Sequence, residues 1–243
     1  MRQSALAAAG SRHVDRQAGS PQQTRFSTIL LRNNLVVVAC RAGTDARGKA
    51  AAMDLFTAFE GAVTSTAEIV KGTEGGLSGA PTPCADWDVR DLLNHIIGTL
   101  WLADGLFADR EPRYMMVPGG LPSTDLVGDD PVAAYAEASS AALAAAGAGD
   151  NLTRVHVTPL GEMPGPVLAG FTTLDILMHG WDLSKATGQP ADLDGRLAAH
   201  ALRFAEQTLA TPESRGSRIA PPVAIDADAS VTMRLAAFLG RQP

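Results

Sequence analysis

Apolar residues recur at helical spacing through most of the chain from Met53 onward. Over residues 53–71 they follow three- and four-residue steps, which is the pattern of a helix that buries one face. The same spacing predicts further helices over 88–107, 131–146, 173–187, 193–209 and 231–239. Residues 154–168 differ, because alternating valines precede a run rich in Pro and Gly, and this pattern predicts a short extended piece and turns.

The start of the second predicted helix carries a complete set of local signals. Asp88 is placed as the N-cap and Asp91 follows three residues later, a capping box with Asp in place of Glu. Trp87 and Leu92 are spaced as the hydrophobic staple of the same helix. Five or six such helices, with no repeat of 20–50 residues, predict an all-α bundle.

Charge divides the chain near residue 52. Residues 1–52 hold eight basic and two acidic side chains, whereas residues 53–243 hold 12 basic and 24 acidic ones, for a formal net charge of -6 overall. The first part also shows no sustained period. We therefore expect a disordered basic leader over 1–52, either a transit peptide or, the interpretation we favour, a segment preceding a true start at Met53. Residues 53–243 form one predicted domain.

Composition excludes several classes of protein. With 46% hydrophobic and 19% charged residues the chain is typical of a globular protein. The apolar run 35–40 is far shorter than the roughly 20 residues that span a bilayer, and polar residues before it interrupt a secretory signal. Two cysteines cannot form a disulfide scaffold, and acidity disfavours nucleic acid. We expect a cytoplasmic protein with a small-molecule substrate and neither a membrane nor a nucleic acid partner; its oligomeric state stays open.

The candidate chemistry is concentrated in one apolar helical segment. At 100° per residue, His179 lies about 40° from Asp175, and Asp182 about 20° to its other side. Three polar groups on an inward face are costly unless partners satisfy them, and a divalent metal binds imidazole and carboxylate together. His95, in the middle of the second helix, is the natural third ligand, because facing helices of a bundle assemble such sites.

Other interpretations of the same residues stay open. His95 could be a hydrogen-bonded core residue, and Asp175 could cap a helix that begins at Thr172. Asp182 could orient a metal ligand or lie in solvent at a helix end. For the remaining candidates we favour packing or structural roles: Cys84, His156, His200 and Trp181.

Two segments resemble a known family. Residues 82–95, TPCADWDVRDLLNH, resemble the second-helix motif of the DinB-like superfamily, and most closely that of the metal-binding domain of mycothiol-dependent maleylpyruvate isomerase and its stand-alone relatives. Residues 179–189, HGWDLSKATGQ, and the ending around 220–223 and 238–241 are similar to the stand-alone relatives. The resemblance covers about residues 53–243 and excludes the leader.

The resemblance implies a four-helix up-down core with a divalent metal, usually zinc-like. By position, His95 and His179 match the two His ligands, Asp175 the carboxylate ligand, and Asp182 a carboxylate implicated in catalysis. Two departures stand out. The isomerase has Glu where this chain has Asp175, and it continues into a second domain that supplies an Arg near the site. No residue here matches that Arg, so Arg234 and Arg241 are only unassigned candidates.

The function that the resemblance implies is a metal-dependent enzyme with a low-molecular-weight thiol as cosubstrate. The open metal position would stabilise the thiolate, and transfer of the thiol to an electrophile or thiol-assisted cis–trans isomerisation both fit. A metal-dependent hydrolase of the same superfamily and a non-catalytic metal- or ligand-binding protein are the alternatives. The long loop 110–129, rich in Gly and Pro, is expected to line the pocket.

Overall fold

The computed structural model describes residues 27–31, 34–38, 53–73, 78–114 and 119–243. Its helices are α1 (Leu55–Lys71), α2 (Val89–Phe107), α3 (Pro131–Gly147), α4 (Gly165–Ala186), α5 (Gly195–Thr208), α6 (Pro212–Arg215) and α7 (Val231–Phe238). Its strands are β1 (Ser27–Leu31), β2 (Asn34–Val38), β3 (Val155–Thr158) and β4 (Gly161–Pro164), which form two antiparallel hairpins. The prediction of an all-α protein with a short extended piece near 154–168 is confirmed.

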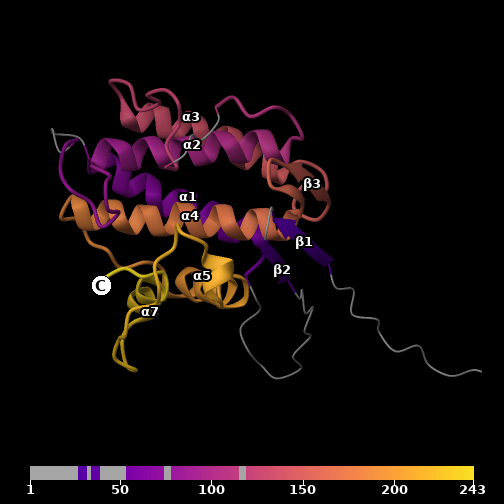
Figure 1. Cartoon of the computed structure of the whole chain (residues 1–243). Coiled ribbons are helices and arrows are strands. Elements are labelled where there is room, and N and C mark those ends of the chain that lie inside the picture. The colour runs from indigo at the N-terminus through magenta and orange to yellow at the C-terminus, as the bar shows by residue number, and fades with distance from the viewer. Residues whose placement is uncertain (1–26, 32–33, 39–52, 74–77, 115–118) are drawn as a thin grey trace, which may run out of the picture.

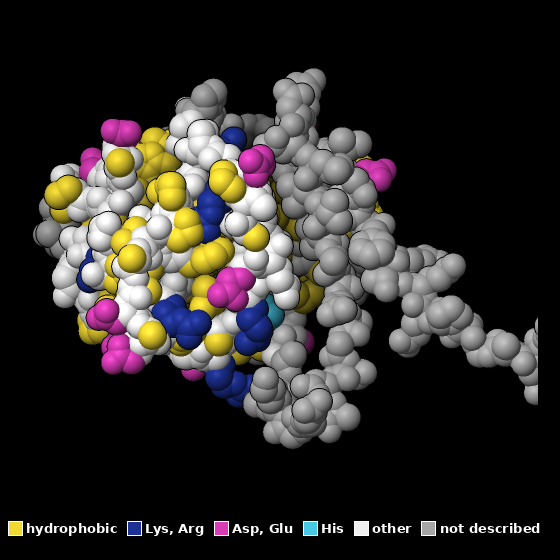
Figure 2. Space-filling view, turned by 60° about the horizontal axis from the view of Figure 1, so that its bottom comes forward, with side chains coloured by type: hydrophobic (Ala, Val, Ile, Leu, Met, Phe, Trp, Pro, Cys, Tyr) yellow, Lys and Arg dark blue, Asp and Glu magenta, His cyan; other side chains and the backbone are white. Residues whose placement is uncertain are grey.

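The four long helices form the bundle. α1 packs against α3 and α4, and α2 packs against the same two helices, so each helix has two neighbours (Figure 1). α5 packs against α4 and α7 on the outside of the bundle. On the lower face of the molecule, Figure 2 shows acidic and basic side chains distributed among hydrophobic ones. Within the described residues, no helix is long and apolar enough to cross a membrane.

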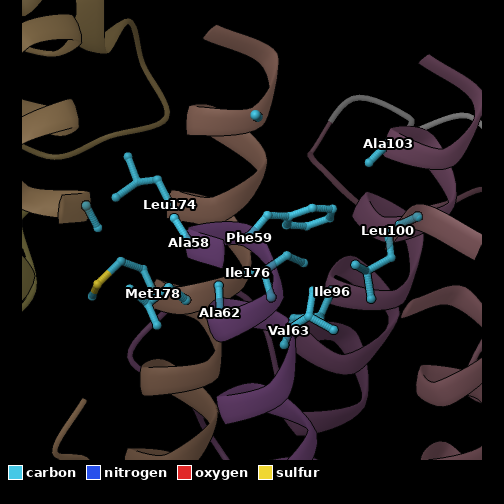
Figure 3. Packing of buried hydrophobic residues seen from close by; sticks show 14 of the residues in the cluster. Ala58, Phe59, Ala62, Val63, Ile96, Leu100, Ala103, Leu174, Ile176 and Met178 are labelled. Atoms are coloured by element: carbon cyan, nitrogen blue, oxygen red, sulfur yellow. The ribbon is translucent and has the colours of Figure 1, made fainter. Parts of the chain in front are cut away.

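The bundle core is built from the apolar faces that the helical spacing predicts. Figure 3 shows Phe59 from α1 with Ile96 and Leu100 from α2 and Ile176 from α4, and all four side chains are fully buried. Each such side chain contributes roughly 1.5–3 kcal/mol through removal from water. The polar residues discussed below are therefore held on helices whose positions are fixed by this core.

A close contact between α1 and α4 sets the rotation of α4. A Cβ at Gly180 would lie 2.3 Å from Thr66 Oγ1, so a larger residue fits only if the Thr66 side chain or α1 moves. Thr66 donates a hydrogen bond to the carbonyl of Ile176 at 3.1 Å, which ties the two helices together. With Gly180 against α1, its neighbour His179 lies on a side of α4 from which it reaches α2.

The predicted start of α4 at residue 173 is wrong by about two turns, since the helix begins at Gly165. The run of Pro and Gly that indicates turns also supplies a proline near the helix start, where a missing N–H costs nothing. Thr172 is consequently not an N-cap: it lies inside the helix, and its hydroxyl donates to the carbonyl of Leu168. The capping role considered for Asp175 is excluded for the same reason, which leaves its carboxylate in the middle of α4.

Other local predictions are confirmed. The capping box at α2 has both its bonds, from the Asp91 N–H to the Asp88 carboxylate and from the Asp88 N–H to the Asp91 carboxylate. The short helix α6 is one that the spacing did not predict. In the expected leader, the backbone of 27–31 and 34–38 forms a hairpin, and its other residues lie outside the described ones. The leader and the boundary at residue 52 stay predictions.

Candidate metal centre

The structure brings together the three predicted metal ligands. His95 lies on α2, and Asp175 and His179 lie one turn apart on α4. His95 Nε2 is 3.2 Å from Asp175 Oδ1, and His179 Nε2 is 3.8 Å from Asp175 Oδ2. One donor atom from each residue lies within 4.8 Å of the other two. Four ligands at 2.0–2.2 Å around a tetrahedral ion are about 3.3–3.6 Å apart, so this arrangement fits a divalent cation with small adjustments.

The outer nitrogens of both imidazoles are fixed by acceptors. His95 Nδ1 lies 2.5 Å from the carbonyl oxygen of Gly120, which can only accept a hydrogen bond. His179 Nδ1 lies 3.1 Å from Asp182 Oδ2. Both acceptors therefore favour a proton on Nδ1, which leaves Nε2 of each neutral ring as the nitrogen that can bind a cation. Metal-binding histidines are commonly oriented in this way by an acceptor on their other nitrogen.

Asp182 lies behind His179 in this arrangement. Its side chain is fully buried, and Arg241 donates to both of its oxygens, from Nη2 to Oδ2 at 2.9 Å and from Nε to Oδ1 at 3.3 Å. Although burial opposes ionisation, the bond from His179 and the charge of Arg241 lower the pKa of Asp182 to about 2. An ionised carboxylate at this point holds the His179 proton in place. Of the two alternatives considered for Asp182, orienting a metal ligand or lying in solvent at a helix end, this geometry supports the first. Its predicted catalytic role stays a prediction.

The electrostatics of the three candidate ligands favour a cation between them. Burial alone would raise the pKa of Asp175, but the positive charges of His95 and His179 lower it. Burial lowers the pKa of His95, but the adjacent Asp175 carboxylate outweighs it and raises that pKa. The carboxylate thus prefers positive charge on the side where both Nε2 atoms lie. A divalent cation supplies that charge and leaves both rings neutral.

One side of the centre is covered by an aromatic ring. The ring of Trp87 lies 4.6 Å from that of His95 and 5.7 Å from that of His179, measured between centroids. Gly120 packs against it, since a Cβ at this position would lie 3.2 Å from Trp87, and its φ of +84° also favours glycine. The expectation that the loop 110–129 reaches the site is thereby confirmed at Gly120.

Access to the centre is easiest at the carboxylate. The side chain of Asp175 is 33% exposed, against 11% for His95 and 13% for His179. A hollow of about 380 Å³ is lined by Arg90, Asp91, Asn94 and residues 121–125. Asn94 and Leu121 are adjacent in sequence to His95 and Gly120, but the three candidate ligands do not line this hollow.

Sequence reasoning missed four contributors to the site. Trp87 was predicted only as a helix staple, Gly120 contributes only a carbonyl, and Cys84 was interpreted as a packed thiol. The Cys84 Sγ lies 3.2 Å from Asp182 Oδ2 and 3.6 Å from His179 Nδ1, and burial together with Asp182 raises the pKa of this thiol. Arg241, left unassigned, is the residue that reaches Asp182.

The remaining candidates lie elsewhere. His156 is fully buried on β3, with Asp109 and the carbonyl of Asn151 as partners. His200 lies on α5, and Arg234 is exposed on α7. Trp181 is buried, and Lys185 stacks on its ring at 5.4 Å. These placements agree with the structural roles favoured for His156, His200 and Trp181.

Comparisons with known proteins agree with the site. The model of the mycothiol maleylpyruvate isomerase N-terminal domain matches residues 59–184, which include all three candidate ligands and Asp182. Two Mycobacterium tuberculosis proteins, from strains CDC 1551 / Oshkosh and ATCC 25618 / H37Rv, are described as uncharacterized. Each aligns over 191 residues at 33% identity, which covers 78% of this chain and 98% of the relative. No solved structure matches significantly. The chain therefore belongs to the family of the mycothiol maleylpyruvate isomerase N-terminal domain, a DinB-like metal-binding family.

Proposed function

We propose that this protein binds a divalent metal, with zinc the expected ion, and uses a low-molecular-weight thiol of the mycothiol type to act on a small electrophile. The reaction is transfer of the thiol or thiol-assisted cis–trans isomerisation. One observation carries the proposal: His95 and His179 direct their Nε2 atoms toward Asp175, while Gly120 and Asp182 hold the opposite nitrogens. Family membership supports the choice of a thiol.

The chain's own residues have distinct parts in this proposal. His95, Asp175 and His179 would hold the cation, and three protein ligands leave a fourth position open for a substrate. A cation there supplies positive charge that stabilises a thiolate at neutral pH. The Trp87 ring covers the two imidazoles and excludes water from that side. Asp175 is the most exposed of the three ligands.

Asp182 and Arg241 position the site. Asp182 keeps the proton on His179 Nδ1, so that Nε2 remains the binding atom. Arg241 contacts both oxygens of Asp182 and fixes the plane of the carboxylate. Asp182 therefore acts through His179, and a conservative change to Asn should alter metal affinity before it alters any step of the reaction.

Metal analysis of the purified protein is the first test. We expect one divalent ion per chain in the wild type and none in His95→Ala or His179→Ala. His200→Ala is the matched control, since it also removes one imidazole but from α5, and it should keep the full metal content. A wild type without stoichiometric metal would overturn the proposal.

Turnover then separates this function from its alternatives. The metal-loaded protein is mixed with a low-molecular-weight thiol and a panel of small electrophiles, with thiol consumption and cis–trans isomerisation as readouts. We expect one of the two, abolished in His179→Ala. Thiol-independent hydrolysis would instead indicate the metal-dependent hydrolase, and no turnover at full metal content would indicate a non-catalytic binding protein.

A further inference from the structure

A second group of donor atoms lies on the other edge of the His179 ring. Cys84 Sγ lies 3.6 Å from His179 Nδ1 and 3.2 Å from Asp182 Oδ2. His179 Nδ1 and Asp182 Oδ2 are 3.1 Å apart. We propose that these three side chains form a second cation site, selective for thiophilic ions such as Cd²⁺. This site shares His179 with the proposed metal centre but includes neither His95 nor Asp175.

The separations fit direct coordination. Zinc-like ions lie about 2.3 Å from sulfur and about 2.0–2.2 Å from nitrogen or oxygen, which places tetrahedral donors roughly 3.3–3.7 Å apart. All three measured distances lie close to that range. Thiolate is the soft ligand that distinguishes this group from the N and O donors of the first centre, so the preference is for thiophilic ions.

The segment that carries Cys84 is held by its own hydrogen bonds. Thr82 Oγ1 accepts from the N–H of Cys84 at 3.1 Å and lies 2.9 Å from the carbonyl oxygen of Trp87. The N–H of Trp87 in turn donates to the carbonyl of Cys84 at 3.2 Å. Asp182 and His179 are fixed on α4. The three donors are therefore positioned before any ion arrives, which lowers the cost of assembling the site.

Ion binding requires the release of one proton. Without an ion the Cys84 thiol donates its hydrogen to Asp182, so coordination replaces an S–H bond with a sulfur–metal bond and sends that proton to water. The proton on His179 Nδ1 moves to Nε2, so that the ring stays neutral and Nδ1 can bind the ion. Arg241 Nη2 contacts the same Asp182 oxygen at 2.9 Å and must yield it, while the contact from Nε to the other oxygen can remain. Arg241 therefore weakens binding at this site through like charge.

The two sites compete for His179. A neutral imidazole has one nitrogen that can bind an ion, and the other nitrogen carries the proton. An ion at the first centre uses Nε2, whereas an ion at the second site uses Nδ1, so occupation of one disfavours the other. The predicted competition depends on the proposed metal centre, whereas the second site could bind an ion even if the first centre did not.

Ultraviolet absorption of the metal-free His95→Ala protein titrated with Cd²⁺ tests the second site, because a cadmium–thiolate bond gives a sulfur-to-metal charge-transfer band. His95→Ala removes the first centre and leaves the second intact, so we expect one equivalent of Cd²⁺ to produce the band. His95→Ala with Cys84→Ser should lack it, although that protein retains Cys40. Absence of the band in His95→Ala, or its persistence without Cys84, would overturn the proposal. Asp175→Asn gives the same test should His95→Ala not fold.

Two further titrations test the mechanism. Arg241→Gln in the His95→Ala background should bind Cd²⁺ at least several-fold more tightly, because a competing positive charge is gone. In the wild type, prior loading with one equivalent of zinc should lower the apparent Cd²⁺ affinity, measured from the charge-transfer band, at least tenfold. Weaker Cd²⁺ binding in Arg241→Gln would contradict the position of the ion at Asp182. An unchanged band after zinc loading would contradict the competition alone and leave the first centre unaffected.

Discussion

Two clusters in this molecule are built from the same three residue types. His179 Nδ1 lies 3.1 Å from Asp182, which is paired with Arg241, and His156 Nδ1 lies 3.1 Å from Asp109, which is paired with Arg154. Asp109 follows the end of α2, whereas His95, beside His179, lies nearer its start. The two clusters are thus at opposite ends of the bundle, about 20 Å apart along α2.

The second ring nitrogen distinguishes the two clusters. His156 Nε2 is 2.6 Å from the carbonyl oxygen of Asn151, and its side chain has no exposure to solvent. Both nitrogens of His156 thus face protein acceptors, and neither is left for a cation. His179 Nε2 is 3.8 Å from Asp175, beyond hydrogen-bond distance, and that ring is 13% exposed. A histidine–aspartate–arginine cluster can therefore support a site only where the second nitrogen faces another candidate ligand, as His179 Nε2 faces Asp175, and not a backbone carbonyl.

The largest expected effect separates the two histidines by metal affinity. His179→Ala should lower zinc affinity at least a thousandfold, because it removes a ligand and leaves two. His156→Ala should leave affinity within about twofold of the wild type, because the lost ring does not reach the metal centre. Calorimetric titration of zinc into the metal-free proteins measures both. Equal losses of zinc affinity in the two variants would show that His179 has no special role in metal binding.

Stability should show the reverse order. His156→Ala leaves a buried cavity and an unsatisfied carbonyl, so the free energy of unfolding of the metal-free protein should fall by about 2–4 kcal/mol. His179→Ala should cost less, about 1 kcal/mol, because its ring is partly exposed and its Nε2 makes no hydrogen bond. Denaturant unfolding in the presence of a chelator compares the two variants. A greater loss in His179→Ala would show that the His179 ring contributes more to the metal-free fold than the His156 ring does.

The carboxylates behind the histidines should differ more modestly. Asp182→Asn should lower zinc affinity about 10- to 100-fold, as expected for a group that orients a metal ligand, and Arg241→Gln should lower it less. Arg154→Gln, the matched change in the other cluster, should leave zinc affinity unchanged. Competition with a chromogenic chelator measures these differences. Full affinity in Asp182→Asn would show that His179 is oriented without its carboxylate.

The smallest effect concerns acid. The pKa of Asp182 is lowered to about 2 in the folded protein, from an ordinary value of 3.8. A lowered folded-state pKa gives stability that is present above the ordinary value and is lost as pH falls through the folded value. The difference in unfolding free energy between wild type and Asp182→Asn, both metal-free, should therefore shrink from about pH 4 to pH 2. A difference independent of pH in that range would show that Asp182 is not ionised in the fold.

Most of the bundle was predictable, because its helices follow apolar spacing and its caps follow short-range chemistry. The start of α4 was not, since the proline-rich residues 164–168 favour turns and a helix start equally until β4 fixes their direction. The angular spacing of Asp175, His179 and Asp182 was visible in the sequence, because helical periodicity alone places them on one face.

Other parts of the candidate site could not be predicted from side-chain patterns. Gly120 contributes a backbone carbonyl, which every residue has, so its sequence carries no signal for that role. Arg241 lies 59 positions from its partner Asp182, and only the packing of α7 against α5 and the path of the chain end bring it there. Contacts of this kind depend on tertiary structure and have no local pattern.

A crystal structure of the zinc-loaded protein, with the ion located by anomalous scattering, tests the central claim most directly. We predict one ion within about 2.0–2.2 Å of Nε2 of His95, Nε2 of His179 and an oxygen of Asp175, with both Nδ1 atoms still bonded to Gly120 and Asp182. An ion bound through Nδ1 of either ring, or no ion among these three residues, would contradict the account.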